Sequence, residues 1–131
     1  MNVDFLKYQI VPKVWGYEKI IVNNNLYCGK ILTTLPNGNA SSVHYHCHKV
    51  ETFFIIRGEL CVQLFDMEQN LKKSMMLKPG EIMTIHPMSP HRFWSDNELC
   101  EFMEVSTFFE DEDSHRMVPA GPKPVEHNID V

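Results

Sequence analysis

Three histidines stand at alternate positions in the segment VHYHCHKVE, and a glutamate follows them closely. His44, His46 and His48 are each separated by one residue, and Glu51 comes directly before the apolar run TFFII. Because side chains two residues apart in an extended strand point to the same face, His44 and His46 can bind one ion. Glu51 has the opposite parity, so a turn or bulge at HKV has to place it on the next strand.

A fourth ligand is available from His91, in the proline-rich segment HPMSPHRFW. Two or three imidazoles with one carboxylate suit a single divalent metal ion, and zinc, manganese, iron, cobalt and nickel all accept such a set. In an octahedral site two positions stay open, enough for two adjacent oxygens of a substrate. Cys47 lies between two of the histidines, but strand alternation points its thiol away from them.

The elements that must position these residues are short strands. Residues 27–35 form an apolar run that ends in the turn PNGN, and residues 52–65 have the pattern of a hairpin that turns at Gly58. Further short strands are predicted at LKKSMML, IMTIH, HRFW and LCEFMEVST, at intervals of about ten residues. This spacing predicts an all-β barrel or sandwich with a core at about residues 27–107. The flank VDFLKYQ can form a helical turn, and about 117–131 is predicted as an extended or mobile tail.

Composition limits the class of protein. A chain of 131 residues, 44% of them hydrophobic, predicts one domain over residues 1–131. A net charge of −5 without a basic cluster argues against nucleic acid as a partner. Asp4 and Lys7 interrupt the segment where a signal peptide is apolar, and no run is long enough to cross a membrane. We therefore expect a cytoplasmic protein that binds no membrane.

The spacing of the histidines resembles the first motif of the cupin superfamily. Gly38, His44, His46, Glu51 and Gly58 follow the pattern G-x5-H-x-H-x4-E-x6-G without a gap. The second cupin motif is weaker, because its spacing is kept but several of its usual residue types are replaced, at His86, Met88 and Ser95. The resemblance implies a double-stranded β-helix, or jelly-roll barrel. It also implies a metal centre whose ligands are His44, His46, Glu51 and His91, with His48 at the mouth of the pocket.

A closer resemblance covers most of the chain. The segments PKVWGYEKIIV, YCGKILTTLPNG and EVSTFFEDEDSHRM resemble the small stand-alone sugar-phosphate cupins and the carboxy-terminal mannose-6-phosphate isomerase domain of type II bifunctional enzymes. Lys49 also resembles its counterpart in lyxose isomerase-like cupins, whereas Thr52 replaces a histidine of the bifunctional enzymes. The resemblance implies a metal-dependent isomerase of a sugar or sugar phosphate, and a homodimer formed through VDFLKYQIV. A non-catalytic sugar-binding cupin and an iron-dependent dioxygenase are the alternatives.

Charged and aromatic residues supply the remaining candidates. Lys49 and Arg92 each adjoin a predicted ligand, and an acidic protein that binds an anionic sugar needs local cations. We therefore predict catalytic roles for Lys49 and Glu51 in proton transfer, and for Arg92 at the anionic end of the substrate. Trp15, Lys30 and His48 are the predicted substrate-binding residues. The acidic run at residues 110–113 is interpreted as a solvated turn.

Overall fold

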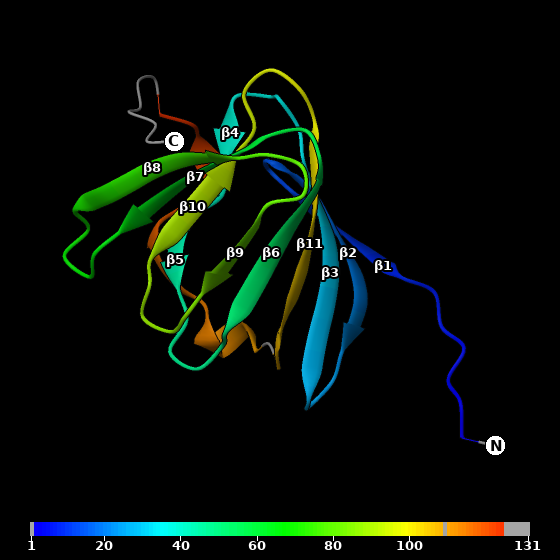
Figure 1. Ribbon diagram of the computed structural model, residues 1–131. Helices are drawn as coiled ribbons and strands as arrows, with labels where there is room; N and C mark the ends of the chain where they lie inside the picture. Colours follow the sequence, from blue (N-terminus) through cyan, green and yellow to red (C-terminus); the bar gives the residue numbers. More distant parts are fainter. Residues whose placement is uncertain (1, 109, 125–131) are drawn as a thin grey trace.

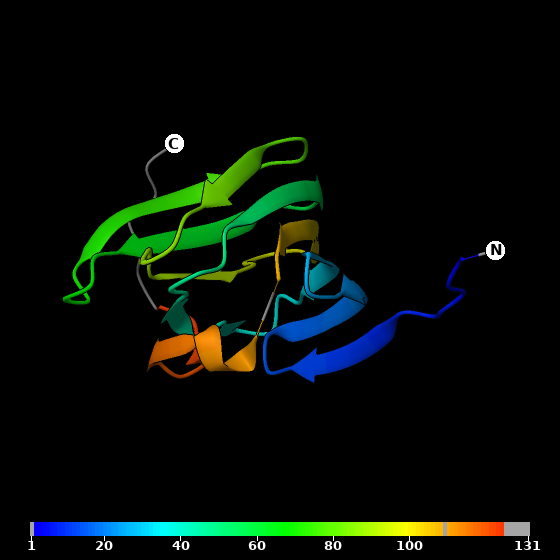
Figure 2. The ribbon, with the colours of Figure 1, turned by 90° about the horizontal axis from the view of Figure 1, so that it is seen from below.

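The computed structural model describes residues 2–108 and 110–124, and two facing antiparallel sheets form its body (Figures 1 and 2). The larger, six-stranded sheet has the order β1-β2-β3-β11-β6-β9, and the smaller, five-stranded one has the order β12-β5-β10-β7-β8. Strands β4 and β13 form a separate pair. The strands are β1 (Gln9–Lys13), β2 (Gly16–Asn23), β3 (Tyr27–Thr34), β4 (Asn39–Ala40), β5 (Val43–Tyr45), β6 (Glu51–Arg57), β7 (Leu60–Phe65), β8 (Leu71–Leu77), β9 (Ile82–Ile85), β10 (His91–Trp94), β11 (Cys100–Thr107), β12 (His115–Val118) and β13 (Gly121–Pro122).

This arrangement confirms the predicted all-β jelly roll. Within the described residues, the one helical segment is a single 3-10 turn, η1 (Asp111–Asp113), and no helix there is long and apolar enough to span a bilayer. Every predicted strand between residues 27 and 107 is present. Strands β1 and β2 extend the larger sheet beyond the predicted core, since β2 pairs with β3 along its length.

The predicted hairpin at Gly58 is wrong, because β6 and β7 belong to different sheets. Strand β6 pairs with β11 and β9, whereas β7 pairs with β10 and β8. Gly58 has a φ of 75°, and a Cβ built on it would lie 2.1 Å from the carbonyl oxygen of Leu99. The glycine therefore allows the chain to turn sharply from one sheet to the other. At this turn Gly58 packs against the backbone that leads into β11.

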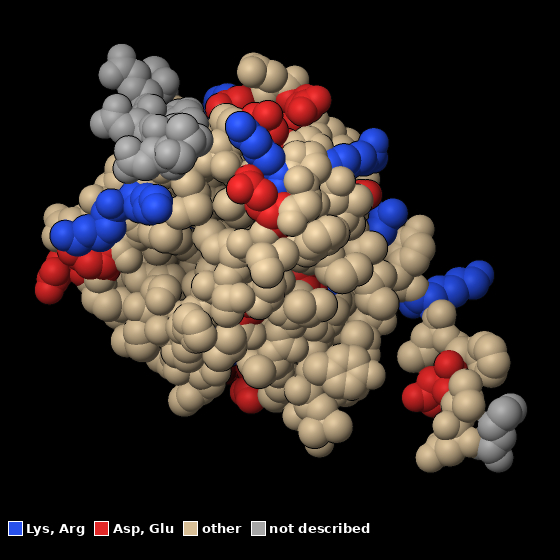
Figure 3. Space-filling view, in the orientation of Figure 1, with Lys and Arg blue, Asp and Glu red and all other residues tan. Residues whose placement is uncertain are grey.

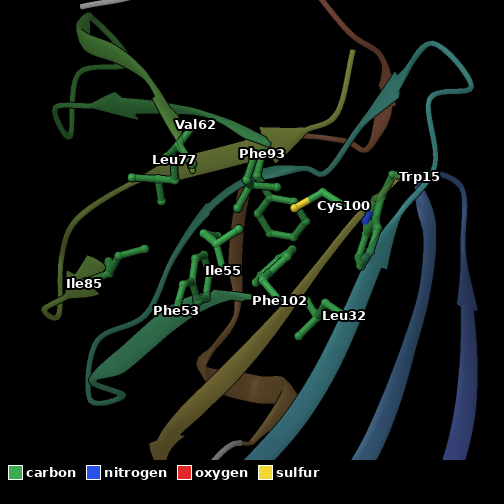
Figure 4. Packing of buried hydrophobic residues seen from close by; sticks show 11 residues of the cluster. Trp15, Leu32, Phe53, Ile55, Val62, Leu77, Ile85, Phe93, Cys100 and Phe102 are labelled. Atoms are coloured by element: carbon green, nitrogen blue, oxygen red, sulfur yellow. The ribbon is translucent and has the colours of Figure 1, made fainter. Parts of the chain in front are cut away.

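Aromatic side chains from both sheets form the core between them (Figure 4). The rings of Phe53, Phe93 and Phe102 meet mainly edge to face, with centroids 5.0–6.0 Å apart. Trp15, which precedes β2, packs edge-on against Phe93 at 5.0 Å. This geometry suits the ring quadrupoles.

The two flanks differ from the sequence prediction in part. Residues 2–8 have no regular structure, so the predicted helical turn is wrong, and this segment extends away from the body as an arm (Figure 1). Phe5 and Leu6 in this arm are 86% and 89% exposed. The homodimer expected through this segment stays a prediction. The first part of the predicted tail is ordered by pairing of β12 with β5 and of β13 with β4, and residues 125–131 lie outside the described part.

The sheet crossing predicts different effects for two left-handed glycines. Gly58→Ala and Gly80→Ala each place an L-residue at a positive φ, which costs about 1–2 kcal/mol. Gly80 has open space around its missing side chain, whereas Gly58 faces the Leu99 carbonyl. We expect denaturant unfolding to show a further loss of about 1–3 kcal/mol for Gly58→Ala. Equal losses in the two variants would contradict this account of the crossing.

Candidate metal centre

The four predicted ligands converge between the sheets. His44 lies on β5 and His91 opens β10, which pairs with β5 at these two residues, while Glu51 opens β6 of the facing sheet. One donor atom from each of His44, His46, Glu51 and His91 lies within 4.8 Å of all the others. The Nε2 atom of His91 is 2.9 Å from Oε1 of Glu51, and that of His46 is 3.9 Å from the same oxygen. The predicted turn after His46 is confirmed, since Glu51 starts the next strand.

Backbone carbonyls orient all three imidazoles. The Nδ1 atoms of His44, His46 and His91 lie 3.0, 2.9 and 2.8 Å from the carbonyl oxygens of Ser42, Asp113 and Ser89, respectively. A ring that donates from Nδ1 keeps the lone pair of Nε2 for a metal. Donation from Nδ1 is the form that a ligand needs, and the Nε2 atoms of His46 and His91 face Glu51.

The electrostatics of the cluster fit a divalent cation. His91 Nε2 and Glu51 Oε1 are buried and only 2.9 Å apart, and neither atom makes a hydrogen bond of acceptable geometry in the described residues. Burial, with His91 nearby, lowers the pKa of His44 to about 3. Burial acts to raise the pKa of Glu51, but His91 and Lys49 outweigh it and the pKa falls. Neutral imidazoles and an ionised carboxylate are the forms that bind metal, and the set accepts any of the five ions predicted above.

Asp113 holds the chain between the ligands. Its carboxylate accepts backbone N–H groups from Cys47, His48 and Lys49 at 2.7, 3.1 and 3.2 Å, and its carbonyl accepts from His46. These bonds outweigh burial and lower the pKa of Asp113. The side chain is only 11% exposed, so the interpretation of residues 110–113 as a solvated turn is wrong for this residue. The acidic run alone gave no signal for this role.

A buried row of charges runs from the metal centre along the larger sheet. Lys49 Nζ lies 2.9 Å from Glu51 Oε2 and 2.7 Å from Glu104 Oε2, and all three residues are buried. Next to Glu104 in register is Lys30 of β3, whose Nζ is 3.7 Å from Glu18 of β2. Burial acts to lower the pKa of Lys49, but Glu104 and Glu51 outweigh it and raise the pKa. Burial, and then Glu51, raises the pKa of Glu104.

The cluster opens into a cavity of about 650 Å³. Trp15 and Lys30, two of the predicted substrate-binding residues, line this cavity together with Lys49 and Glu104. Arg116 of β12, which belongs to the segment EVSTFFEDEDSHRM of the sugar-cupin resemblance but was not among the predicted site residues, also lines it. The cavity therefore brings a metal centre, a buried ion pair and an aromatic ring to one space.

Two predicted residues lie elsewhere. Arg92 follows His91 on β10, so its side chain leaves the opposite face of the strand. There it donates to Gln63 at 2.8 Å and packs over Phe65. The structure thus does not bring Arg92 to the cavity, because strand alternation separates it from its neighbour. His48 is exposed and lines a separate pocket of about 260 Å³.

The surface carries charges of both signs. On the face shown in Figure 3, lysines and arginines are interspersed with acidic residues and do not gather into a basic patch over the described part of the chain. The expectation that nucleic acid is not a partner stays a prediction.

The fold and the cluster together define a jelly-roll protein with a centre of three histidines and one glutamate. Its family follows from residues 31–106, more than half of the chain, which match the cupin domain, so the protein belongs to the cupin family.

Solved structures with the same fold include several oxalate decarboxylases. A single-substitution variant from Bacillus subtilis has a TM-score of 0.71 and 18% identity, with 84% of this chain and 30% of that chain covered. The enzyme from Lactobacillus farciminis, in a formate complex, has a TM-score of 0.70 and 19% identity, with 89% and 37% covered. A B. subtilis structure described by its Mn(II) centres has a TM-score of 0.70 and 17% identity, with 84% and 30% covered. A search of curated proteins finds no match.

This chain thus spans less than half the length of those enzymes. At these identities the likeness shows the shared fold, and their substrate does not transfer to this chain with it.

Removing one ligand is expected to remove the metal. His46→Ala takes away a buried donor atom. Losing a group that only orients a ligand lowers metal affinity about 10–100-fold, so losing a ligand itself should lower it further. Isothermal titration with manganese measures this, and His86→Ala, at an exposed histidine outside the cluster, is the control. Melting with and without manganese should show stabilisation of the native chain and none of His46→Ala. Unchanged affinity in His46→Ala would remove the ligand assignment.

Asp113 is expected to support metal binding without being a ligand of this centre. Asp113→Ala frees three backbone N–H groups of the segment between the ligands, and affinity should fall about 10–100-fold. Glu112→Ala removes the same charge from the same turn and should leave the affinity unchanged. Equal affinities for the two variants would show that the acidic turn has no influence on the centre.

Proposed function

We propose that this cupin is a metal-dependent isomerase that interconverts an aldose and a ketose, either as free sugars or as sugar phosphates. The observation that carries the proposal is the position of Glu104, a buried carboxyl group with a raised pKa that lines the same cavity as the metal ligands. A raised pKa brings a carboxyl group closer to the operating pH of a general base. The cavity volume also lies within the about 300–1,000 Å³ usual for small-molecule sites.

The reaction needs one group that moves a proton between adjacent carbons. Glu104 takes the proton from the carbon next to the carbonyl and returns it to the former carbonyl carbon, while the hydroxyl proton passes from one oxygen to the other. A divalent ion held by the four ligands supplies Lewis-acid polarisation of the carbonyl and hydroxyl oxygens. Trp15 and Phe53 give the cavity apolar walls.

Lys49 serves in this scheme as a fixed cation. Its two carboxylate partners, Glu104 and Glu51, raise its pKa, so in this scheme it stays protonated and does not carry the proton. It holds Glu104 and Glu51 in one orientation, and its charge limits the repulsion between them. The proton carrier is therefore assigned to Glu104 rather than to Lys49.

A substrate with an anionic end is favoured by cations on the cavity wall. Arg116 and Lys13 line the cavity, and neither forms an ion pair within the described part of the chain. Arg116 thus replaces Arg92 as the proposed partner of a phosphate group. The same cations favour a second candidate function, chemistry on a small carboxylic acid, as in the oxalate decarboxylases of similar fold.

Glu104→Gln is expected to abolish isomerisation while the metal is retained. Metal-loaded chain is incubated in deuterated water with a panel of aldoses, ketoses and their phosphates, and deuterium beside the carbonyl is measured. We expect exchange to slow about 100-fold to 10,000-fold in the variant. Glu101→Gln is the matched control, because Glu101 lies on the same strand with its side chain on the opposite face.

Other outcomes identify the alternatives. If no sugar in the panel exchanges with the native chain, the isomerase proposal fails. Oxygen uptake by iron-loaded protein would then favour a dioxygenase. Release of carbon dioxide from oxalate would favour a decarboxylase, and sugar binding without turnover would favour a binding module.

A further inference from the structure

Three side chains beside the metal centre take no part in the proposed reaction. Of the four cysteines, Cys47 is the one that is not fully buried. One donor atom from each of Cys47, Asp113 and His115 lies within 4.8 Å of the other two. Cys47 lies in the bend just after β5, and its thiol is one donor of this second cluster.

The strand pairing places these donors together. Strands β5 and β12 pair with His115 opposite Tyr45, so Cys47, two residues beyond Tyr45, meets Asp113, two residues before His115. The contact is made directly, because the Cys47 N–H donates to Asp113 Oδ1 at 2.7 Å. The cluster is thus built by the register of two strands.

The donors are also held in place before any ion binds. The ring of His115 stacks on that of Tyr45, with centroids 5.0 Å apart and planes 23° from parallel. Three backbone N–H groups fix the Asp113 carboxylate, and its Oδ1 atom accepts only one of them, which leaves a second lone pair. The fold therefore orders these ligands in advance, and binding an ion costs less conformational entropy.

The distance between the carboxylate and imidazole donors suits a tetrahedral ion. Bonds of about 2.0–2.3 Å to zinc place neighbouring ligand atoms about 3.3–3.8 Å apart. Asp113 Oδ1 and His115 Nε2 are 3.7 Å apart. The side chain of His115 is 41% exposed, so the site faces solvent and a fourth position can hold water.

We infer that Cys47, Asp113 and His115 form a second metal site for one borderline divalent ion, with zinc or cobalt as the matching type. A thiolate with an imidazole and a carboxylate favours such ions over magnesium, calcium or manganese. The site is linked to the first centre through Asp113, whose carbonyl accepts from the ring of His46. Its occupation therefore stiffens the segment that carries Lys49. The inference does not depend on the proposed isomerase activity.

Cobalt titration of the full chain tests the site directly. A cysteine thiolate bound to Co²⁺ gives a charge-transfer band in the near ultraviolet that nitrogen and oxygen ligands do not give. We expect the native chain to bind two equivalents and to show this band. Cys47→Ser should bind one equivalent without the band, and His115→Phe, which keeps a ring against Tyr45, should behave in the same way.

A variant of the first centre gives the reciprocal result. His91→Ala removes one ligand of that centre and touches none of the three second-site residues, so it should lose one equivalent and keep the band. One equivalent in the native chain would overturn the inference. So would two equivalents without a thiolate band, or a band that survives in both Cys47→Ser and His115→Phe. Native mass spectrometry counts the bound ions independently of the absorption.

Discussion

The rest of the site depends on the burial of one carboxylate, Glu51. It is 2% exposed, and it faces imidazoles on one side and the ammonium of Lys49 on the other. An ionised carboxylate is costly to remove from water unless cations and hydrogen-bond donors surround it. Because Glu51 belongs to the larger sheet and its imidazole partners lie on or next to strands of the smaller one, satisfying this single group ties the two layers together at their polar end.

The metal centre and the substrate walls come from different parts of the fold. The ligands lie on β5, β6, β10 and the loop after β5, whereas Lys13, Glu18 and Lys30 lie on β1, β2 and β3 of the larger sheet. Changes on these three strands can therefore alter the charge and shape of the cavity without moving a ligand. This separation explains how proteins of one fold can hold similar centres and act on unrelated substrates.

The sequence predicted what depends on local spacing and failed where distant segments meet. Alternation along one strand was enough to pair His44 with His46, and the same rule, applied to His91, would have sent Arg92 to the outer face. Glu104 and Asp113 gave no such signal, because each acts on a segment more than fifty residues earlier in the chain. Gly58 correctly indicated a turn, but a glycine does not reveal whether the strands on either side share a sheet.

The position of β11 has a consequence for how the chain folds. This strand lies between β3 and β6 and pairs with both, although it follows them by dozens of residues. During synthesis, β3 and β6 therefore leave the ribosome with open edges that no earlier strand can close. These edges can pair only after β11, in the last third of the protein, has been synthesised. The loop entropy of such long-range pairing makes this step slow. Until then the two exposed edges are where a nascent chain can pair with another copy and aggregate.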